Sequence, residues 1–161
     1  DGVAIGEVCA RSNVVFKGYW EQPEETARAI RDGWFHTGDL AVWDELGNIH
    51  IVDRRKDVII SGGENISSPE IEEALYRHPA VLECAVIGVP HEKWGETPKA
   101  LVVARAGTRP TEAELLAFCR EHLAHFKCPR SVDFDPDLPR LPTGKLFKRR
   151  LIDRYRDAAS K

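Results

Sequence analysis

The first third of the chain alternates apolar and polar residues in short runs that are separated by turn residues. Residues 40–43 and 49–52 are two such runs, and residues 44–48 between them contain Asp, Gly and Asn, which favour a turn. This pattern predicts a β-hairpin. The remaining elements predicted in this part are strands at residues 6–11 and 14–16 and a helix with proline and acidic residues at its start at residues 23–30.

The pattern changes after the charged run at residues 53–57. From there the apolar spacing predicts the order β-α-β-β-α-β, which is typical of small split βαβ sandwiches. The predicted elements are strands at 58–60, 84–89, 100–104 and 132–134, a helix capped by Ser68, a helix that begins at a capping box of Thr111 and Glu114, and a basic final helix at 146–159.

These two patterns predict an α+β protein in two parts. We expect residues 1–55 to form a small β-rich subdomain. Residues 56–161 are expected to form a compact C-terminal domain, joined to the first part near residues 53–57. Residues that carry chemistry are then expected in the loops.

Charge and length narrow the function classes. The chain has 161 residues, of which 26 are acidic and 23 are basic, so its formal net charge is -3. This near balance argues against a protein that coats nucleic acid or an anionic membrane. The longest apolar run, at residues 84–89, is far shorter than the ~18 residues of a membrane-spanning helix. Since the chain begins at Asp1 and contains no Met, we expect it to be a piece of a longer protein.

The four cysteines form no C-x-x-C pair, which predicts reduced thiols in a cytoplasmic protein. Cys119, His122, His125 and Cys128 recur at every third residue, and all four are zinc-ligand types. Steps of three on a helix drift by ~60° each, so these side chains do not converge on one ion unless the helix breaks, as Pro129 would allow. We therefore predict an ordinary helix end and no metal site.

Three loops carry residue types suited to nucleotide chemistry, although each signal is weak alone. The carboxylate of Asp39, beside Gly38, can accept hydrogen bonds from vicinal hydroxyls such as those of a ribose, or it can stabilise a turn. Residues 61–65 form a glycine turn, which a tight β connection also explains. Lys145 follows a Pro-Thr-Gly arm that lacks the full phosphate-loop motif. It begins a basic cluster with residues 148–150, for which a solvated helix face is the alternative to nucleic-acid binding.

In their joint order, the motifs resemble the C-terminal part of the acyl-CoA synthetases, which belong to the adenylate-forming superfamily. The resemblance extends over nearly the whole chain. It is carried by residues 18–20, 23–26, 32–39, 53–59, 62–66, 69–72, 89–92, 94–96, 126–130 and 141–145.

The resemblance implies an ATP-dependent acid–CoA ligase. In such enzymes ATP, with Mg2+, and a carboxylic acid form an acyl-adenylate, and coenzyme A then displaces AMP. Lys145 would be the catalytic residue that bridges carboxylate and phosphate in the first step. Because its ammonium would block the approach of the coenzyme A thiol, the resemblance implies that residues 56–161 form a mobile domain, which swings between two poses about a hinge at residues 53–57, at Lys56. Residues 1–55 would then be the β-rich end of the large adenylate-binding domain.

The resemblance also assigns the binding residues. Thr37, Asp39 and Arg54 would bind the nucleotide, with Asp39 on the ribose hydroxyls. At Cys128 the chain departs from a basic residue that some relatives have there. The residues implied to bind coenzyme A are Ser61, Gly62, Gly63, Glu64, Trp94, Phe126 and Arg130.

Further expectations concern partners. The phosphate loop and acyl pocket of the family would lie in a missing N-terminal domain, so we expect the chain alone to be inactive. For the same reason, the sequence does not identify the acid substrate. Lys145 resembles a lysine that acetyltransferases modify, and no nucleic-acid partner is expected. The alternatives are an adenylation domain that serves a carrier protein, a non-enzymatic binding module, and the luciferase branch, whose Ser-Lys-Leu ending the chain lacks.

Overall fold

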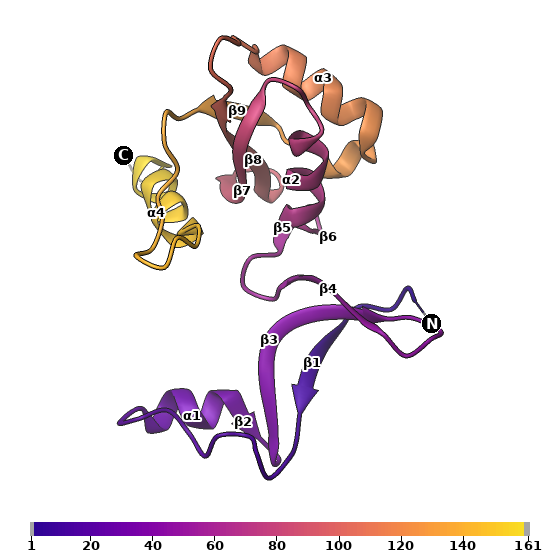
Figure 1. Cartoon of the computed structure of the whole chain (residues 1–161), viewed down its shortest axis with the longest axis vertical. Coiled ribbons are helices and arrows are strands. Elements are labelled where there is room, and N and C mark those ends of the chain that lie inside the picture. Colours follow the sequence, from indigo (N-terminus) through magenta and orange to yellow (C-terminus); the bar gives the residue numbers. More distant parts are fainter. Residues whose placement is uncertain (1, 160–161) are drawn as a thin grey trace. The chain divides into compact units, whose positions relative to one another are not determined.

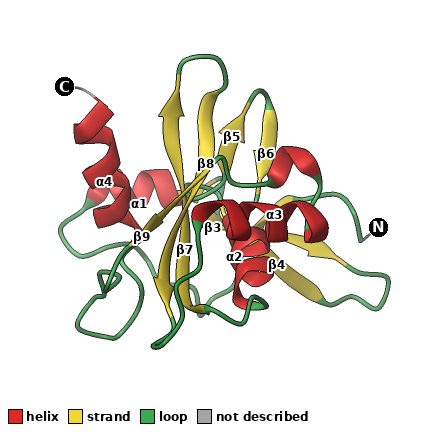
Figure 2. Ribbon diagram, turned by 90° about the horizontal axis from the view of Figure 1, so that it is seen from above, coloured by secondary structure: helices red, strands yellow, loops and turns green. Residues whose placement is uncertain are grey.

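The structure is a computed structural model that describes residues 2–159 (Figures 1 and 2). The chain divides into two compact units, Asp1–Lys56 and Asp57–Lys161. Both helices and sheets are present, so the predicted α+β class is confirmed. Among the described residues, no helix is long and apolar enough to cross a membrane.

The first unit is an antiparallel sheet built around one long strand. β3 (Trp34–Trp43) pairs with β1 (Gly6–Ala10), with β2 (Ile30–Arg31) and with β4 (Ile49–Arg54), and α1 (Pro23–Ala29) precedes β2. The predicted hairpin is confirmed, since Trp43 lies opposite Ile49. Asp44 closes its turn by accepting the backbone N–H groups of Leu46 and Asn48 at 2.9 and 2.8 Å.

The strand predicted at residues 14–16 is wrong. This segment is a turn, in which the hydroxyl of Ser12 accepts the backbone N–H of Val14 and the carbonyl of Ser12 accepts that of Val15, both at 3.3 Å. A serine at the start of a turn competes with the strand ladder in this way. The ring of Phe16 packs edge-on against Phe35 at a centroid distance of 5.0 Å, so its apolar character serves side-chain packing rather than a strand.

The second unit is a sheet with helices on both faces. The sheet has the order β6-β5-β8-β7, and β9 pairs parallel with β8. Its elements are β5 (Ile59–Ser61), β6 (Glu64–Ile66), α2 (Ser68–Tyr76), β7 (Val81–His91), β8 (Gly95–Ala104), α3 (Glu112–His122), the 3-10 turn His125–Lys127, β9 (Ser131–Phe134) and α4 (Lys148–Ala159).

Alternation along β7 divides the core of this unit into two layers. Cys84 and Val86 pack with residues of α2 and α3, whereas Ala85 and Ile87 pack with Leu151 of α4. Side chains on a strand point alternately to its two faces, so α2 and α3 cover one face of the sheet and α4 covers the other.

Three details of the second unit test the sequence expectations. The capping box is confirmed, because the hydroxyl of Thr111 accepts the backbone N–H of Glu114 and the carboxylate of Glu114 accepts that of Thr111. The predicted cap at Ser68 is wrong: Ser67 is the N-cap, and Ser68 is buried as the first residue of α2. The predicted order also lacked β6, a strand too short and too polar to show an apolar run.

Candidate functional site

Thr37, Gly38 and Asp39 lie inside β3 rather than in a loop. Gly38 has φ +75°, a conformation that favours glycine. The Thr37 hydroxyl donates to the carbonyl of Val8 at 2.8 Å and accepts the backbone N–H of Asp39 at 3.1 Å. The tripeptide is therefore held rigidly by the neighbouring strand and by its own side chain.

Asp39 and Arg54 are cross-strand neighbours. They lie opposite each other in the β3–β4 ladder, and Arg54 Nε donates to Asp39 Oδ1 at 3.1 Å. The Asp39 side chain is 31% exposed, and its second carboxylate oxygen has no hydrogen bond or ion pair within residues 2–159. The structure thus brings two of the expected nucleotide-binding residues together and leaves one oxygen able to accept a hydroxyl.

Glu7 organises this region, although nothing in the sequence marked it. Its carboxylate accepts the backbone N–H of Gly38 at 3.2 Å and contacts His36 Nδ1 at 2.9 Å and Arg55 at 3.6 Å. The hydrogen bond with His36, aided by the charge of Arg55, holds the pKa of Glu7 below its ordinary value. Glu7 lies on a plain alternating strand at least 29 residues from each of these partners, so its role is visible only in the fold.

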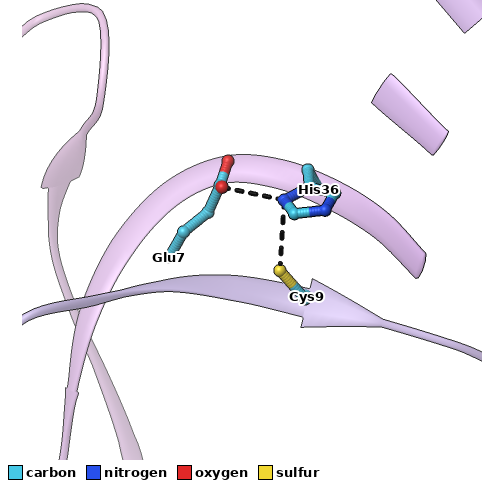
Figure 3. A group of neighbouring side chains, drawn as sticks. All are labelled: Glu7, Cys9 and His36. Atoms are coloured by element: carbon cyan, nitrogen blue, oxygen red, sulfur yellow. Dashed lines mark hydrogen bonds and ion pairs between the residues drawn. The ribbon is translucent and has the colours of Figure 1, made fainter. Parts of the chain in front are cut away.

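Glu7, Cys9 and His36 form the one group within the described residues whose ligand atoms are close enough to hold a metal ion (Figure 3). The Glu7 carboxylate and the Cys9 thiol contact the same ring nitrogen, His36 Nδ1, and the thiol lies 3.4 Å from it. The guanidinium of Arg31 lies 2.8 Å from that nitrogen and 3.8 Å from Glu7. Since Arg31 and Arg55 already supply positive charge here, we assign this group to an ion-pair network rather than to a metal.

The series that repeats every third residue begins in α3 at Cys119 and His122 and continues beyond its end to His125 and Cys128, and these ligand atoms are not grouped closely enough to hold a metal ion. Cys119 and Cys128 are buried in the apolar core, and burial raises the pKa of both thiols, that of Cys119 to about 11. His122 Nδ1 bonds the carbonyl of Phe118 at 2.8 Å, and the His122 ring stacks on the Phe118 ring at 4.1 Å. Cys119 and Cys128 thus belong to the core, and His122 belongs to the end of α3.

Backbone bonds that hold the segment near the expected hinge end at Arg55. Its N–H donates to the carbonyl of Gly38 at 2.8 Å, while its guanidinium lies 3.6 Å from Glu7. Lys56 is the last residue of the first unit, is exposed, and makes no hydrogen bond or ion pair within the described part of the chain.

The expected glycine loop is a tight hairpin between β5 and β6. Ser61 and Glu64 are paired across it, and Gly62 and Gly63 form the turn with φ +61° and +90°. Positive φ at both central residues is the usual geometry of a two-residue hairpin. Trp94 lies over this turn: its carbonyl accepts the N–H of Gly62 at 2.9 Å, and a Cβ at Gly62 would lie 2.7 Å from the Trp94 ring.

Five of the expected CoA-binding residues therefore lie together, while the other two belong to a separate segment. Phe126 is 47% exposed on the 3-10 turn, which Lys127 ties to Glu70 of α2 at 2.7 Å. Arg130 is exposed, and neither it nor Phe126 makes a hydrogen bond, ion pair or ring contact with the hairpin among residues 2–159. The thiol of Cys128 is buried against the carbonyl of Ala124, so it takes no part in an exposed site.

Lys145 lies at the end of a closed loop. The carbonyl of Lys145 accepts the N–H of Leu141, and the carbonyl of Leu141 accepts that of Gly144, both at 2.8 Å. Gly144 has φ +83°, and Arg140 pairs with Leu146 across the loop. The side chain of Lys145 is exposed and makes no hydrogen bond or ion pair in the described part of the chain, so its ammonium is available to an anionic ligand.

Comparison with known proteins finds a family model and relatives to which the chain is similar. Residues 70–145 match the model of the AMP-binding enzyme C-terminal domain. The chain is 52% identical over 151 residues to a probable CoA ligase of Humulus lupulus, covering 92% of this chain and 27% of the relative. It is 51% identical over 150 residues to feruloyl-CoA synthase of an Amycolatopsis species, covering 93% and 30%. The chain thus spans less than a third of either relative.

Two crystal structures of one protein, MatB from Rhodopseudomonas palustris, match the chain to different degrees. Each match covers 98% of this chain and 32% of MatB. The ATP-bound structure gives a TM-score of 0.91 at 43% identity. The apo structure gives 0.69 at 44% identity.

Proposed function

Because the chain carries an AMP-binding enzyme C-terminal domain and its relatives are CoA ligases, we propose that it is the C-terminal part of an ATP-dependent acid–CoA ligase. The parent enzyme adenylates a carboxylic acid and passes the acyl group to coenzyme A. The single observation that carries this proposal is the exposed, unpaired ammonium of Lys145 on a closed loop at the end of the matched domain.

In the first step, Lys145 neutralises negative charge that develops between the carboxylate and the α-phosphate. A fixed cation stabilises such charge best where water is excluded, so the remainder of the enzyme must supply the adenylate pocket. Asp39 accepts hydrogen bonds from the ribose hydroxyls through its open carboxylate oxygen. Arg54 holds the Asp39 carboxylate in place at 3.1 Å, and Thr37 fixes its backbone at 3.1 Å.

In the second step, the hairpin at residues 61–64 faces the thiol in place of Lys145. Gly62 and Gly63 carry no side chains, which leaves width for a pantetheine arm, and Trp94 beside them offers a flat apolar surface. Ser61 and Glu64 lie at the rim of this hairpin. Phe126 and Arg130 bind another part of coenzyme A, with Arg130 supplying a guanidinium for phosphate.

The C-terminal domain changes from the first pose to the second by rotating about Lys56. Two observations support this hinge. The backbone bonds of the first unit end at Arg55, and the units divide directly after Lys56.

Two other functions are less well supported. An adenylation domain that serves a carrier protein would use the same first step, but the relatives named above are a probable CoA ligase and a CoA synthase. A nucleic-acid-binding module would need free positive charge on α4. Most of that charge is neutralised instead, because Lys148, Arg149 and Arg154 are paired with carboxylates at 2.7, 2.9 and 2.6 Å.

Three further features belong to the proposal. Mg2+ accompanies ATP as its counter-ion in the whole enzyme. Acetylation of Lys145 by a lysine acetyltransferase removes the charge and stops the first step. A reducing, cytoplasmic location fits a chain whose four cysteines are all free.

The test uses the full-length protein with ATP, Mg2+, coenzyme A and a panel of short, aromatic and fatty acids. We expect AMP, pyrophosphate and one class of acyl-CoA, detected by mass spectrometry, and no product from the 161-residue chain alone. Release of ADP, or absence of any thioester across the panel, contradicts the proposal. Thioester formation by the chain alone contradicts the proposed need for an N-terminal domain.

A further inference from the structure

Arg140 contacts the loop that carries Lys145 and joins it to the sheet. One guanidinium nitrogen donates to the carbonyl of Gly144, the residue directly before Lys145, at 2.8 Å. Another donates to a carboxylate oxygen of Glu83 on β7 at 2.7 Å. The Arg140 and Glu83 side chains are 44% and 35% exposed, so the pair is partly shielded from water.

The other bonds of the loop are local. Leu141 and Lys145 bond to each other through their backbones, and so do Leu141 and Gly144. Phe147 N–H donates to the carbonyl of Pro139 at 2.8 Å at the base of the loop. These bonds close the loop on itself, but none of them joins the Gly144–Lys145 peptide to the sheet. Arg140 makes that connection through a planar fork whose donors have a fixed spacing.

We propose that Arg140 is a positioning residue for Lys145, and that Arg140 with Glu83 fixes where the ammonium is presented. This inference rests on the proposed role of Lys145 in adenylation. The pairing of Arg140 with Glu83 could not be predicted from the sequence, because the two residues are 57 residues apart. An error of about 1 Å in the position of a catalytic group can lower a rate by about 100-fold, so a clamp one residue away from Lys145 has a direct kinetic effect.

Arg140→Ala in the full-length enzyme tests the clamp. Each half-reaction is measured alone: ATP–pyrophosphate exchange with the acid for the first step, and thioester formation from supplied acyl-adenylate for the second. We expect kcat of the first step to fall about tenfold or more, whereas the second step stays within about twofold. Glu83→Ala should give the same defect. The double variant should be no worse than either single variant, because the two residues act as one unit.

Arg154→Ala is the matched control. It removes an arginine–carboxylate pair of similar length, 2.6 Å to Asp135, at a similar arginine exposure of 50%, and Arg154 makes no hydrogen bond to the loop. We expect Arg154→Ala to leave both half-reactions unchanged. Arg140→Lys should recover part of the lost rate, because a single ammonium keeps the charge but cannot fill both sites of the fork.

A second readout needs no catalysis. Hydrogen exchange of the full-length protein, followed by mass spectrometry of the peptide at residues 139–147, reports the backbone bonds donated by Leu141 and Gly144. Exchange should be faster in Arg140→Ala than in the wild type, and unchanged in Arg154→Ala. A loss of thermal stability in Arg140→Ala with equal slowing of both half-reactions would show a merely structural role.

The outcomes separate this inference from the proposed function. Suppose that Lys145→Ala abolishes the first step, whereas Arg140→Ala changes neither that step nor the hydrogen exchange of the loop. The positioning role is then wrong, and the ligase assignment stands. If Lys145→Ala has no effect on the first step, the role of Lys145 is wrong, and the positioning role fails with it. Faster exchange of the loop without a kinetic defect would overturn the positioning role too.

Discussion

The contact between Gly62 and Trp94 gives a prediction that can be worked out from the geometry. Replacing Gly62 by Ala places a Cβ 2.7 Å from one ring carbon of Trp94 and 3.1 Å from another. The carbonyl of Trp94 is held by the N–H of Gly62 at 2.9 Å, so the ring has to rotate away rather than move with its backbone. Gly63 is the matched control, since a Cβ there meets nothing within 4 Å.

The expected cost has two parts. A non-glycine residue in a left-handed conformation costs about 1–2 kcal/mol, which applies to Gly62 at φ +61° and to Gly63 at φ +90°. The alanine also restricts the unfolded chain, which offsets about 0.4–1 kcal/mol. We therefore expect Gly63→Ala to cost about 1 kcal/mol. Gly62→Ala adds overpacking against Trp94 of about 1–3 kcal/mol, for a total of about 2–4 kcal/mol.

Urea unfolding followed by far-ultraviolet circular dichroism measures both variants. The second unit holds the three longer helices, so this signal reports mainly on that unit. In a Trp94→Ala background, the cost of Gly62→Ala should fall to about that of Gly63→Ala, because the overlap is gone. Equal costs for Gly62→Ala and Gly63→Ala in the wild-type background would refute the placement of Trp94 over the turn.

Three further measurements test other parts of the structure. Lys148→Met leaves Glu72 unpaired where both side chains are less than a fifth exposed, so it should lower the free energy of unfolding by about 2–4 kcal/mol in the same urea assay. The folded-state pKa of Glu7 lies below its ordinary value of 4.5, so its stabilising effect is present above pH 4.5 and is lost as pH falls through the folded pKa. The Tm advantage of wild type over Glu7→Gln should therefore shrink as pH falls from above 4.5 through the folded pKa, and a constant difference would contradict this. An alkylating reagent should modify exposed Cys9 in the native chain but spare buried Cys84, whose pKa burial raises to about 12; peptide mapping that finds Cys84 modified as fast as Cys9 would contradict the structure.

Sequence reasoning worked best where local rules decide the structure. The hairpin closed by Asp44 and the capping box of Thr111 follow from side chains that bond their near neighbours, and the structure shows both. It failed at residues 14–16, where Ser12 draws the backbone into a turn, and at β6, whose polar residues pair only because β5 lies beside them.

In the candidate site, too, the residues in local motifs could be predicted, whereas those that depend on distant partners could not. Asp39, Gly62 and Lys145 carry recognisable chemistry in recognisable motifs, so they could be named from the sequence. Glu7 and Arg140 could not, because each acts through partners that only the fold brings close. Residues that hold a site in place have no motif of their own when their partners are far away in sequence.

The most direct test of the central claim is Lys145→Ala in the full-length enzyme, with the two half-reactions measured separately. We predict that ATP–pyrophosphate exchange is lost, because no other group supplies the ammonium at the carboxylate and α-phosphate. Thioester formation from supplied acyl-adenylate and coenzyme A should persist, because the hairpin at residues 61–64 replaces Lys145 in that step. Survival of both half-reactions would contradict the account and leave Lys145 as an exposed surface lysine.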